Sequence, residues 1–92
     1  MNIAEVKHQF TYAGTSHNVY HCKAGEGLPR HEHEYNHATV CHAGRLACRK
    51  EGKYFELTPD SKPVVLTGKE WHELEALEDG TVFENIFTVG NY

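Results

Sequence analysis

Turn-forming residues divide this chain into short runs that are rich in β-branched and aromatic side chains. Within the runs, apolar and polar residues alternate with a period of two, which is the period of a half-buried β-strand. The turns fall at residues 24–27, 43–44, 50–53, 58–61, 67–69 and 78–80. Short strands separated by turns at intervals of roughly 8–12 residues predict an all-β barrel or sandwich.

The segment 69–78 fits this pattern least well. It is rich in Glu, Leu and Ala, which have good helix propensity. However, His72, Leu74 and Ala76 alternate with charged or amphipathic neighbours, and glycine-containing turns bracket a piece of strand length. We therefore predict a strand in this segment, followed by a last strand over residues 81–89.

Length and charge limit the class of protein. With 92 residues, the chain is long enough for one domain but too short for two independent cores. Its net charge of −4 argues against nucleic-acid binding, which would need a basic patch. No apolar run approaches the roughly 20 residues that span a membrane, so no membrane partner is expected. The first residues lack the features of a signal peptide, which predicts a cytoplasmic protein.

The three cysteines, Cys22, Cys41 and Cys48, form no Cys-x-x-Cys pair. An odd number of cysteines in a chain without a secretion signal favours free thiols over a disulfide framework. We expect each thiol to fill apolar space in the core, as a small buried residue does.

Three of the eight histidines fall in one short stretch, and a fourth follows a later apolar run. His31 and His33 are two residues apart, so in an extended strand their rings project to the same face. His37 follows four residues later, and His72 stands alone. Because imidazole is the commonest protein ligand of transition metals, this grouping predicts a metal site. Ordinary surface or core roles are expected for the other four, His8, His17, His21 and His42.

The spacing of these residues resembles the first motif of the cupin superfamily. That motif reads Gly, five residues, His-x-His, three or four residues, Glu, six residues and Gly. In this chain Gly25, His31, His33 and Gly44 stand at the expected places. The position of the Glu is occupied by His37, which departs from the family pattern.

A second cupin motif is matched more loosely by residues 58–72. This segment contains a turn, an apolar strand with its glycine, and His72 at the place of the family's last ligand. The resemblance covers about residues 18–90. It leaves residues 1–17 as an N-terminal strand or arm of the same single domain.

The resemblance implies an antiparallel jelly-roll barrel, or double-stranded β-helix, with one divalent transition-metal ion inside. Carried over by position, the ligands are His31, His33, His37 and His72. Neutral imidazole in place of the carboxylate leaves the full charge of the ion, which favours an anionic ligand. Fe, Mn, Co, Ni, Cu and Zn are all compatible with such ligands. Glu34 stays an alternative to His37 as the fourth ligand if the loop bends.

Strand alternation also predicts which side chains line the pocket. If His37 points inward, Thr39 and Cys41 share its face, and Leu46 and Cys48 lie on the inward face of the next strand. For the last strand, the sequence does not show which alternate set of side chains faces inward, because the geometry of the preceding turn is not known. The inward set is therefore either Val82-Glu84-Ile86 or Phe83-Asn85-Phe87.

A divalent ion with open coordination positions can polarise a carbonyl, activate water or bind O₂ beside a substrate. We therefore expect a metal-dependent enzyme that acts on a small oxygenated anion, with dioxygenase chemistry ahead of isomerase or lyase chemistry. The alternative is a non-catalytic cupin that binds a metal or small ligand, as a sensor or sugar-binding module. Whether the chain is an enzyme stays open at this point. Because exposed sheet edges favour association, a homodimer is expected.

Overall fold

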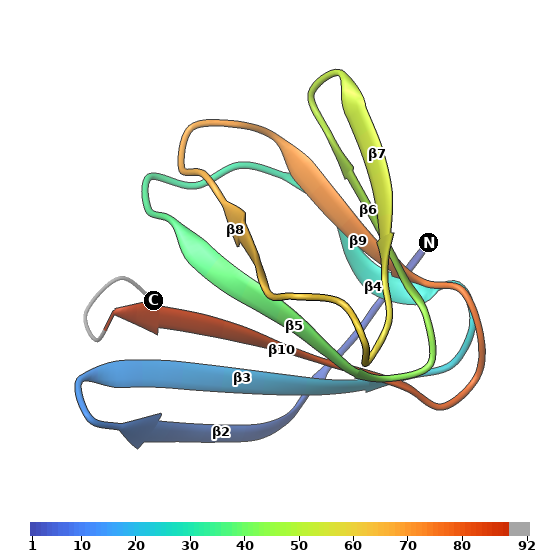
Figure 1. Cartoon of the computed structure of the whole chain (residues 1–92), viewed down its shortest axis with the longest axis horizontal. Coiled ribbons are helices and arrows are strands. Elements are labelled where there is room, and N and C mark those ends of the chain that lie inside the picture. Colours follow the sequence, from blue (N-terminus) through green and yellow to red (C-terminus); the bar gives the residue numbers. More distant parts are fainter. Residues whose placement is uncertain (89–92) are drawn as a thin grey trace.

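Two five-stranded sheets make up the protein (Figure 1). The computed structural model describes residues 1–88. The first sheet contains, in spatial order, β1 (Asn2–Ile3), β4 (Glu26–His31), β9 (His72–Ala76), β6 (Leu46–Lys50) and β7 (Lys53–Leu57). The second contains β2 (Val6–Tyr12), β3 (Thr15–Cys22), β10 (Thr81–Thr88), β5 (His37–Ala43) and β8 (Val64–Leu66). In this part of the chain, no helix has the length and apolarity that crossing a membrane requires.

The prediction of an all-β protein is confirmed. Neighbouring strands pair antiparallel, apart from the parallel pair β1 and β4. The segment 69–78 contains β9 and no helix, because its inward side chains alternate with a period of two and are buried between neighbouring strands. β10 covers residues 81–88 of the predicted last strand, and position 89 lies outside the described residues.

The expected closed barrel is an open arrangement of two sheets instead. Within residues 1–88, no strand pairing joins one sheet to the other. Figure 1 shows the sheets meeting at one end and diverging towards the other. Two of the four edge strands, β1 and β8, have only two and three residues, so they offer little backbone for pairing with the other sheet.

The N-terminal residues take part in both sheets. β1 pairs with β4, and β2 forms a hairpin with β3, which begins at Thr15 and so ahead of residue 18. The C-terminal limit of the expected barrel, residues 89 and 90, lies outside the described part of the chain. Residues 1–17 thus supply two strands and the start of a third.

Side chains from both sheets meet in one apolar core. Its buried members are Ala4, Tyr20, Cys22, Cys41, Leu46, Cys48, Leu57, Leu66, Leu74, Ala76 and Phe83. On β10 the buried side chains are Thr81, Phe83, Asn85 and Phe87, so the inward-facing set is the one that contains Phe83, Asn85 and Phe87. All three cysteines are free and buried, as predicted.

Close packing of β4 against β9 determines where the histidines lie. Gly27 on β4 has no side chain, and a Cβ atom there would lie only 2.0 Å from the carbonyl oxygen of Leu74 on β9. Further along the same pair of strands, His31 stands opposite His72 in the register. Side chains that face each other across a strand pair are in contact range, so this register brings two of the candidate ligands together.

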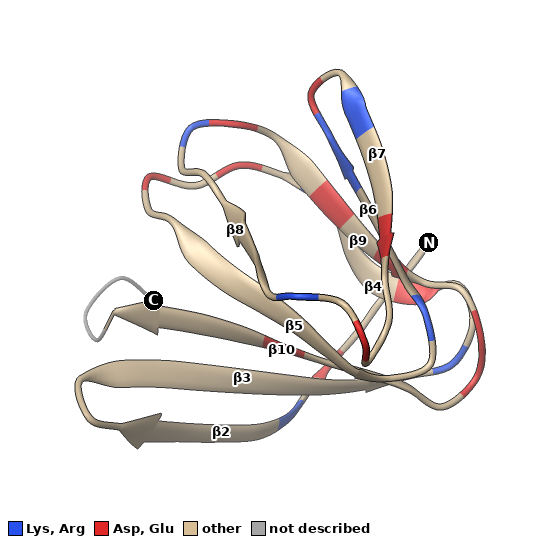
Figure 2. Ribbon diagram, in the orientation of Figure 1, with Lys and Arg blue, Asp and Glu red and all other residues tan. Residues whose placement is uncertain are grey.

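Charged side chains lie mainly on the first sheet and in the loops, whereas the second sheet carries few (Figure 2). Arg49 on β6 contacts Glu75 at 2.8 Å and Glu73 at 3.5 Å, both on the neighbouring β9. Such partly exposed ion pairs contribute about 0–1 kcal/mol each, so the sheets are held by the apolar core between them.

Candidate metal centre

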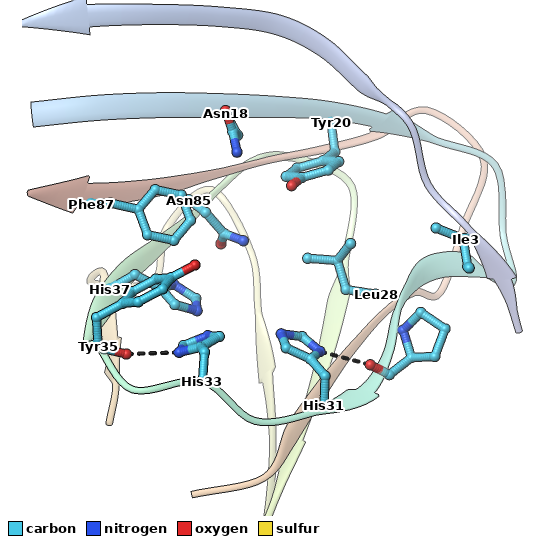
Figure 3. Close-up of a pocket in the computed structure, with 11 residues that line it drawn as sticks. Ile3, Asn18, Tyr20, Leu28, His31, His33, Tyr35, His37, Asn85 and Phe87 are labelled. Carbon is cyan, nitrogen blue, oxygen red and sulfur yellow. Dashed lines mark hydrogen bonds between the residues drawn. The ribbon is translucent and has the colours of Figure 1, made fainter. Parts of the chain in front are cut away.

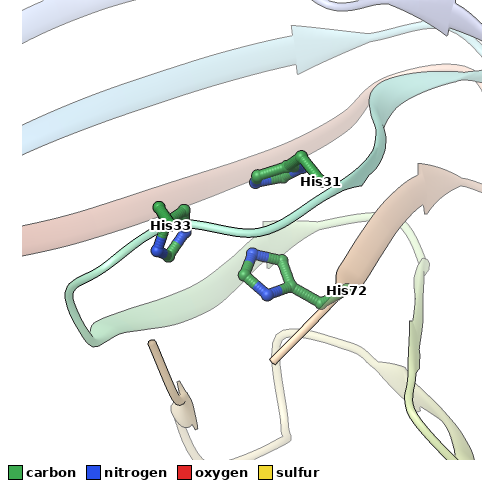
Figure 4. A group of neighbouring side chains, drawn as sticks. All are labelled: His31, His33 and His72. Atoms are coloured by element: carbon green, nitrogen blue, oxygen red, sulfur yellow. The ribbon is translucent and has the colours of Figure 1, made fainter. Parts of the chain in front are cut away.

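Four histidines from three strands and one loop come together at the open end of the two sheets. His31 ends β4, His33 lies in the loop that follows, His37 begins β5 and His72 begins β9. Ligand atoms of His31, His33 and His72 all lie within 4.8 Å of one another (Figure 4). The Nε2 atom of His37 is 3.4 Å from the Nε2 atom of His72. The geometry therefore groups His31, His33 and His72 as a triad, and His37 adjoins this triad through His72.

Backbone carbonyls hold three of the rings through their Nδ1 atoms. The Nδ1 of His31 is 2.7 Å from the carbonyl oxygen of Pro29, and that of His33 is 2.7 Å from the carbonyl oxygen of Tyr35 (Figure 3). The Nδ1 of His72 is 3.3 Å from the carbonyl oxygen of Glu70. A carbonyl oxygen only accepts, so each Nδ1 carries the proton. In the neutral rings, the lone pair is then on Nε2, which is the arrangement that metal-ligating histidines use.

The fourth ring is fixed by a side-chain relay. The hydroxyl of Thr39 donates to Oδ1 of Asn85 at 2.7 Å. Since the only proton of this hydroxyl is used there, its oxygen accepts from Nδ1 of His37 at 3.2 Å. His37 therefore also has its lone pair on Nε2. The Nε2 atoms of His37 and His72, each with a lone pair, lie 3.4 Å apart. A cation bound by both nitrogens would remove the repulsion between the two lone pairs.

Burial favours the neutral form of three of the rings, those of His33, His37 and His72. Burial, reinforced by His72 and His33, lowers the pKa of His37 to about 3. Burial, followed by the effect of His31 and His33, lowers the pKa of His72 to about 4. The pKa of His33 is also lowered by burial. Neutral imidazole is the form that binds a metal ion, so His33, His37 and His72 do not have to lose protons at neutral pH before they act as ligands.

Glu34, the alternative fourth ligand, lies elsewhere. Its side chain is 84% exposed, and its Oε2 atom is 3.7 Å from Nζ of Lys69. The loop does not bend so as to bring this carboxylate into the cluster. The position next to His72 is taken by His37 instead.

A pocket of about 410 Å³ opens beside the histidines (Figure 3). Its apolar and aromatic lining consists of Ile3, Tyr20, Leu28, Pro29, Tyr35 and Phe87. Its polar lining consists of Asn18, Asn85, His31, His33 and His37. His72 lies behind this wall and is 1% exposed. The pocket is thus bounded by the histidine cluster at one side and by the inner faces of β3 and β10 at another.

The four residues predicted to line the pocket face the interior, but they lie outside the lining of this pocket. Thr39, Cys41, Leu46 and Cys48 are all buried, but none of them lines the pocket. Cys41, Leu46 and Cys48 lie deeper, in the apolar core, and Thr39 lies behind His37. The inward direction of a side chain does not tell how far along the strand the cavity extends, and the core fills this end of the molecule.

Several lining residues were missed because they come from strands that carry no motif. Asn18 and Tyr20 lie on β3, and Ile3 lies on the short β1. In a strand, side chains two residues apart face the same side, so the sequence could have placed Asn18 and Tyr20 on one face together with Cys22. Nothing in the sequence indicates that β1 pairs with β4 and so reaches the pocket.

The remaining histidines lie away from the cluster. His17 and His42 both contact Glu84 on β10, at 2.5 Å and 2.7 Å respectively. These two hydrogen bonds outweigh the effect of burial and lower the pKa of the Glu84 carboxyl group. Glu84 belongs to the outward-facing set of β10, so this group of residues is separated from the pocket by the sheet itself.

Comparisons with known proteins identify the fold. No model of a protein family matches the sequence, and no curated protein matches it. Among solved structures, KdgF from Halomonas sp. is 19% identical, with a TM-score of 0.76, and the match covers 86% of this chain and 73% of that protein.

Two further structures carry the name of the fold. A cupin-2 domain protein from Shewanella frigidimarina is 11% identical, with a TM-score of 0.72 over 91% of this chain and 82% of its own. A protein with a double-stranded β-helix domain from Klebsiella pneumoniae is 15% identical, with a TM-score of 0.72 over 90% of this chain and 70% of its own. The fold class implied by the sequence resemblance is confirmed. The chain has the fold of a small cupin, the double-stranded β-helix.

Proposed function

We propose that this protein binds one divalent transition-metal ion through His31, His33, His37 and His72. The observation that carries the proposal is the common orientation of the rings. Every Nδ1 has an oxygen partner, ligand atoms of His31, His33 and His72 lie within 4.8 Å of one another, and Nε2 of His37 lies 3.4 Å from Nε2 of His72. Chance proximity of histidines does not require such partners behind each ring, whereas a metal site does. Four imidazoles suit Fe, Mn, Co, Ni, Cu and Zn.

We further propose that the site serves catalysis on a small oxygenated molecule held in the pocket. When bound, the ion would polarise an oxygen group of the substrate or bring O₂ next to it. The protein's own contribution is to position the substrate, with Tyr20 and Phe87 as walls and Asn85 as a polar contact. We place oxygenase chemistry ahead of isomerase or lyase chemistry. Among the described residues the lining offers no carboxylate or lysine, so proton transfer in an isomerase or lyase would depend on Tyr20, Tyr35 or a histidine.

The absence of Asp, Glu, Lys and Arg from the described lining residues also supports a second candidate function. A pocket with ligands for a metal but no acidic or basic group other than histidine also suits a cupin that binds a small molecule without converting it. In that case the ion and the pocket serve as a sensor or a binding module.

Metal analysis combined with oxygen uptake tests these proposals. Protein without a histidine tag is expected to retain about one equivalent of added metal, the His72→Ala variant to lose it, and the exposed His21→Ala variant to keep it. Less than about a tenth of an equivalent in the unmodified protein contradicts the metal site. Fe(II)-loaded protein is then mixed with O₂ and a panel of 2-oxo acids, diketones and thiols. Substrate-dependent uptake supports the oxygenase, and metal binding without any uptake supports the binding module.

A further inference from the structure

Among residues 1–88, the pocket wall carries no Asp, Glu, Lys or Arg side chain. Of the 11 lining residues, three are histidines, two are asparagines, and six are apolar or aromatic. The charged residues of the adjacent loops, Glu32, Glu34 and Lys69, line a neighbouring hollow on the other side of His33 and Tyr35. A carboxylate or ammonium group placed against Tyr20, Leu28 and Phe87 would therefore lose part of its hydration without gaining an ionic partner, which is costly.

The walls opposite the histidines are aromatic and held in place. Tyr20 stacks on Phe83 with 4.7 Å between ring centroids. Phe87 packs against Tyr35 at 5.3 Å and against His37 at 5.2 Å. Figure 3 shows Tyr20, Leu28 and Phe87 on the side of the pocket that faces the histidines. Packed rings of this kind offer a fixed apolar surface, which suits an aliphatic or aromatic body of a ligand.

One amide of the wall has a fixed direction. The Oδ1 atom of Asn85 accepts the hydrogen bond from Thr39 at 2.7 Å, so the NH₂ group is the end that is left for other partners. In Figure 3 the nitrogen of Asn85 points into the pocket. An uncharged oxygen acceptor on a ligand could bind there, between the apolar wall and the histidines.

We infer that the ligand of this pocket is a small molecule with one singly charged oxygen-donor head and an uncharged, mainly apolar tail. The head meets the histidine cluster, the tail lies against Tyr20, Leu28 and Phe87, and a carbonyl or hydroxyl oxygen accepts from Asn85. This inference rests on the proposed metal site, because the charge of the head is balanced there. It excludes ligands with a second carboxylate at the far end.

Two 2-oxo acids of equal chain length test this inference. 2-Oxopentanoate and 2-oxoglutarate share the same head and differ only in a terminal methyl or carboxylate group. Each is titrated into Co(II)-loaded protein while the visible spectrum of the ion is recorded. We expect 2-oxopentanoate to bind at least about tenfold more tightly, because the second carboxylate has no partner. Independently, its binding to Zn(II)-loaded protein is expected to shift the NMR signals of the Asn85 side-chain amide.

A variant at the mouth of the pocket gives the matched comparison. Ile3 lines the pocket but is 72% exposed, so it can be replaced without disturbing the core. Ile3→Arg supplies a cation and should improve 2-oxoglutarate binding about two- to fivefold, whereas the uncharged Ile3→Gln should not. Equal or tighter binding of 2-oxoglutarate, or no binding of 2-oxopentanoate to protein that holds Co(II), overturns the inference alone. Failure to hold Co(II) overturns the proposed metal site and the inference with it.

Discussion

The substitution Thr39→Val separates the role of the relay behind His37 from the general stability of the fold. Thr39 is fully buried, and its hydroxyl accepts from Nδ1 of His37 and donates to Oδ1 of Asn85. Valine has nearly the same shape and removes only the hydroxyl. One buried N–H group and one buried carbonyl oxygen therefore lose their partner in a single step.

The size of the effect follows from these two groups. Each buried polar group without a partner costs about 1–3 kcal/mol. We expect the free energy of unfolding of the metal-free protein to fall by about 2–4 kcal/mol, since small rotations of the imidazole and the amide recover part of the loss. Removing a group that orients a metal-ligating histidine lowers metal affinity about 10–100-fold, and we expect a loss in this range. Urea unfolding measures the first quantity, and competition for Zn²⁺ with a chromophoric chelator measures the second.

Two control variants make the result decisive. Thr39→Ser keeps the hydroxyl and should retain Zn²⁺ affinity within about threefold, despite the lost methyl group. Thr81 is equally buried, and its hydroxyl donates to the carbonyl oxygen of Glu78 at 2.8 Å, away from the histidines. Thr81→Val should therefore lower stability but leave Zn²⁺ affinity unchanged. If Thr39→Val and Thr81→Val bind Zn²⁺ equally well, the reasoning about the relay is refuted.

Four further predictions follow from the same geometry. The pKa values of His37 and His72 are about 3 and 4, against 6.5 in the unfolded chain, so acid favours unfolding. The unfolding free energy of metal-free protein should fall from pH 6.5 to about 4, by up to about 1.4 kcal/mol per pH unit for each ring, and a flat urea-midpoint profile contradicts this. Glu34→Gln should leave Zn²⁺ affinity unchanged, and a clear loss would make Glu34 a ligand. Gly27→Ala should cost about 3 kcal/mol or more, because its Cβ meets a carbonyl oxygen of β9 at 2.0 Å; a thermal midpoint equal to that of the unmodified protein would show that the strands can separate. We propose that the protein is a homodimer, so light scattering should give twice the chain mass of 10.5 kDa, and a mass of one chain contradicts this.

The sequence was informative wherever a local rule decides the outcome. Because side chains alternate in direction along a strand, the sequence predicted that His37, Thr39 and Cys41 share one face, and all three are buried in β5. It also predicted a strand over the helix-prone segment around His72, because inward-facing side chains decide that choice and intrinsic propensity does not. The four histidines could be named because their spacing follows a pattern.

Features that depend on long-range pairing could not be predicted. The sequence did not show which side chains of β10 face inward, because a turn of unknown geometry precedes the strand. Only the pairing of β10 with β3 and β5 places Asn85 on the inward face. The pocket includes Ile3 because two residues of β1 pair in parallel with β4, for which no sequence signal exists. The openness of the sheets depends on edge strands whose lengths are set by tertiary contacts.

The central claim is that four histidines present Nε2 to one ion while Nδ1 of each ring keeps its proton. A long-range ¹H–¹⁵N NMR spectrum of the histidine rings, recorded before and after one equivalent of Zn²⁺, tests it directly. The account predicts metal-induced Nε2 shifts in four rings only, those of His31, His33, His37 and His72, each of which keeps its proton on Nδ1. Unchanged ring spectra, or coordination through Nδ1 in any of these four, would contradict it.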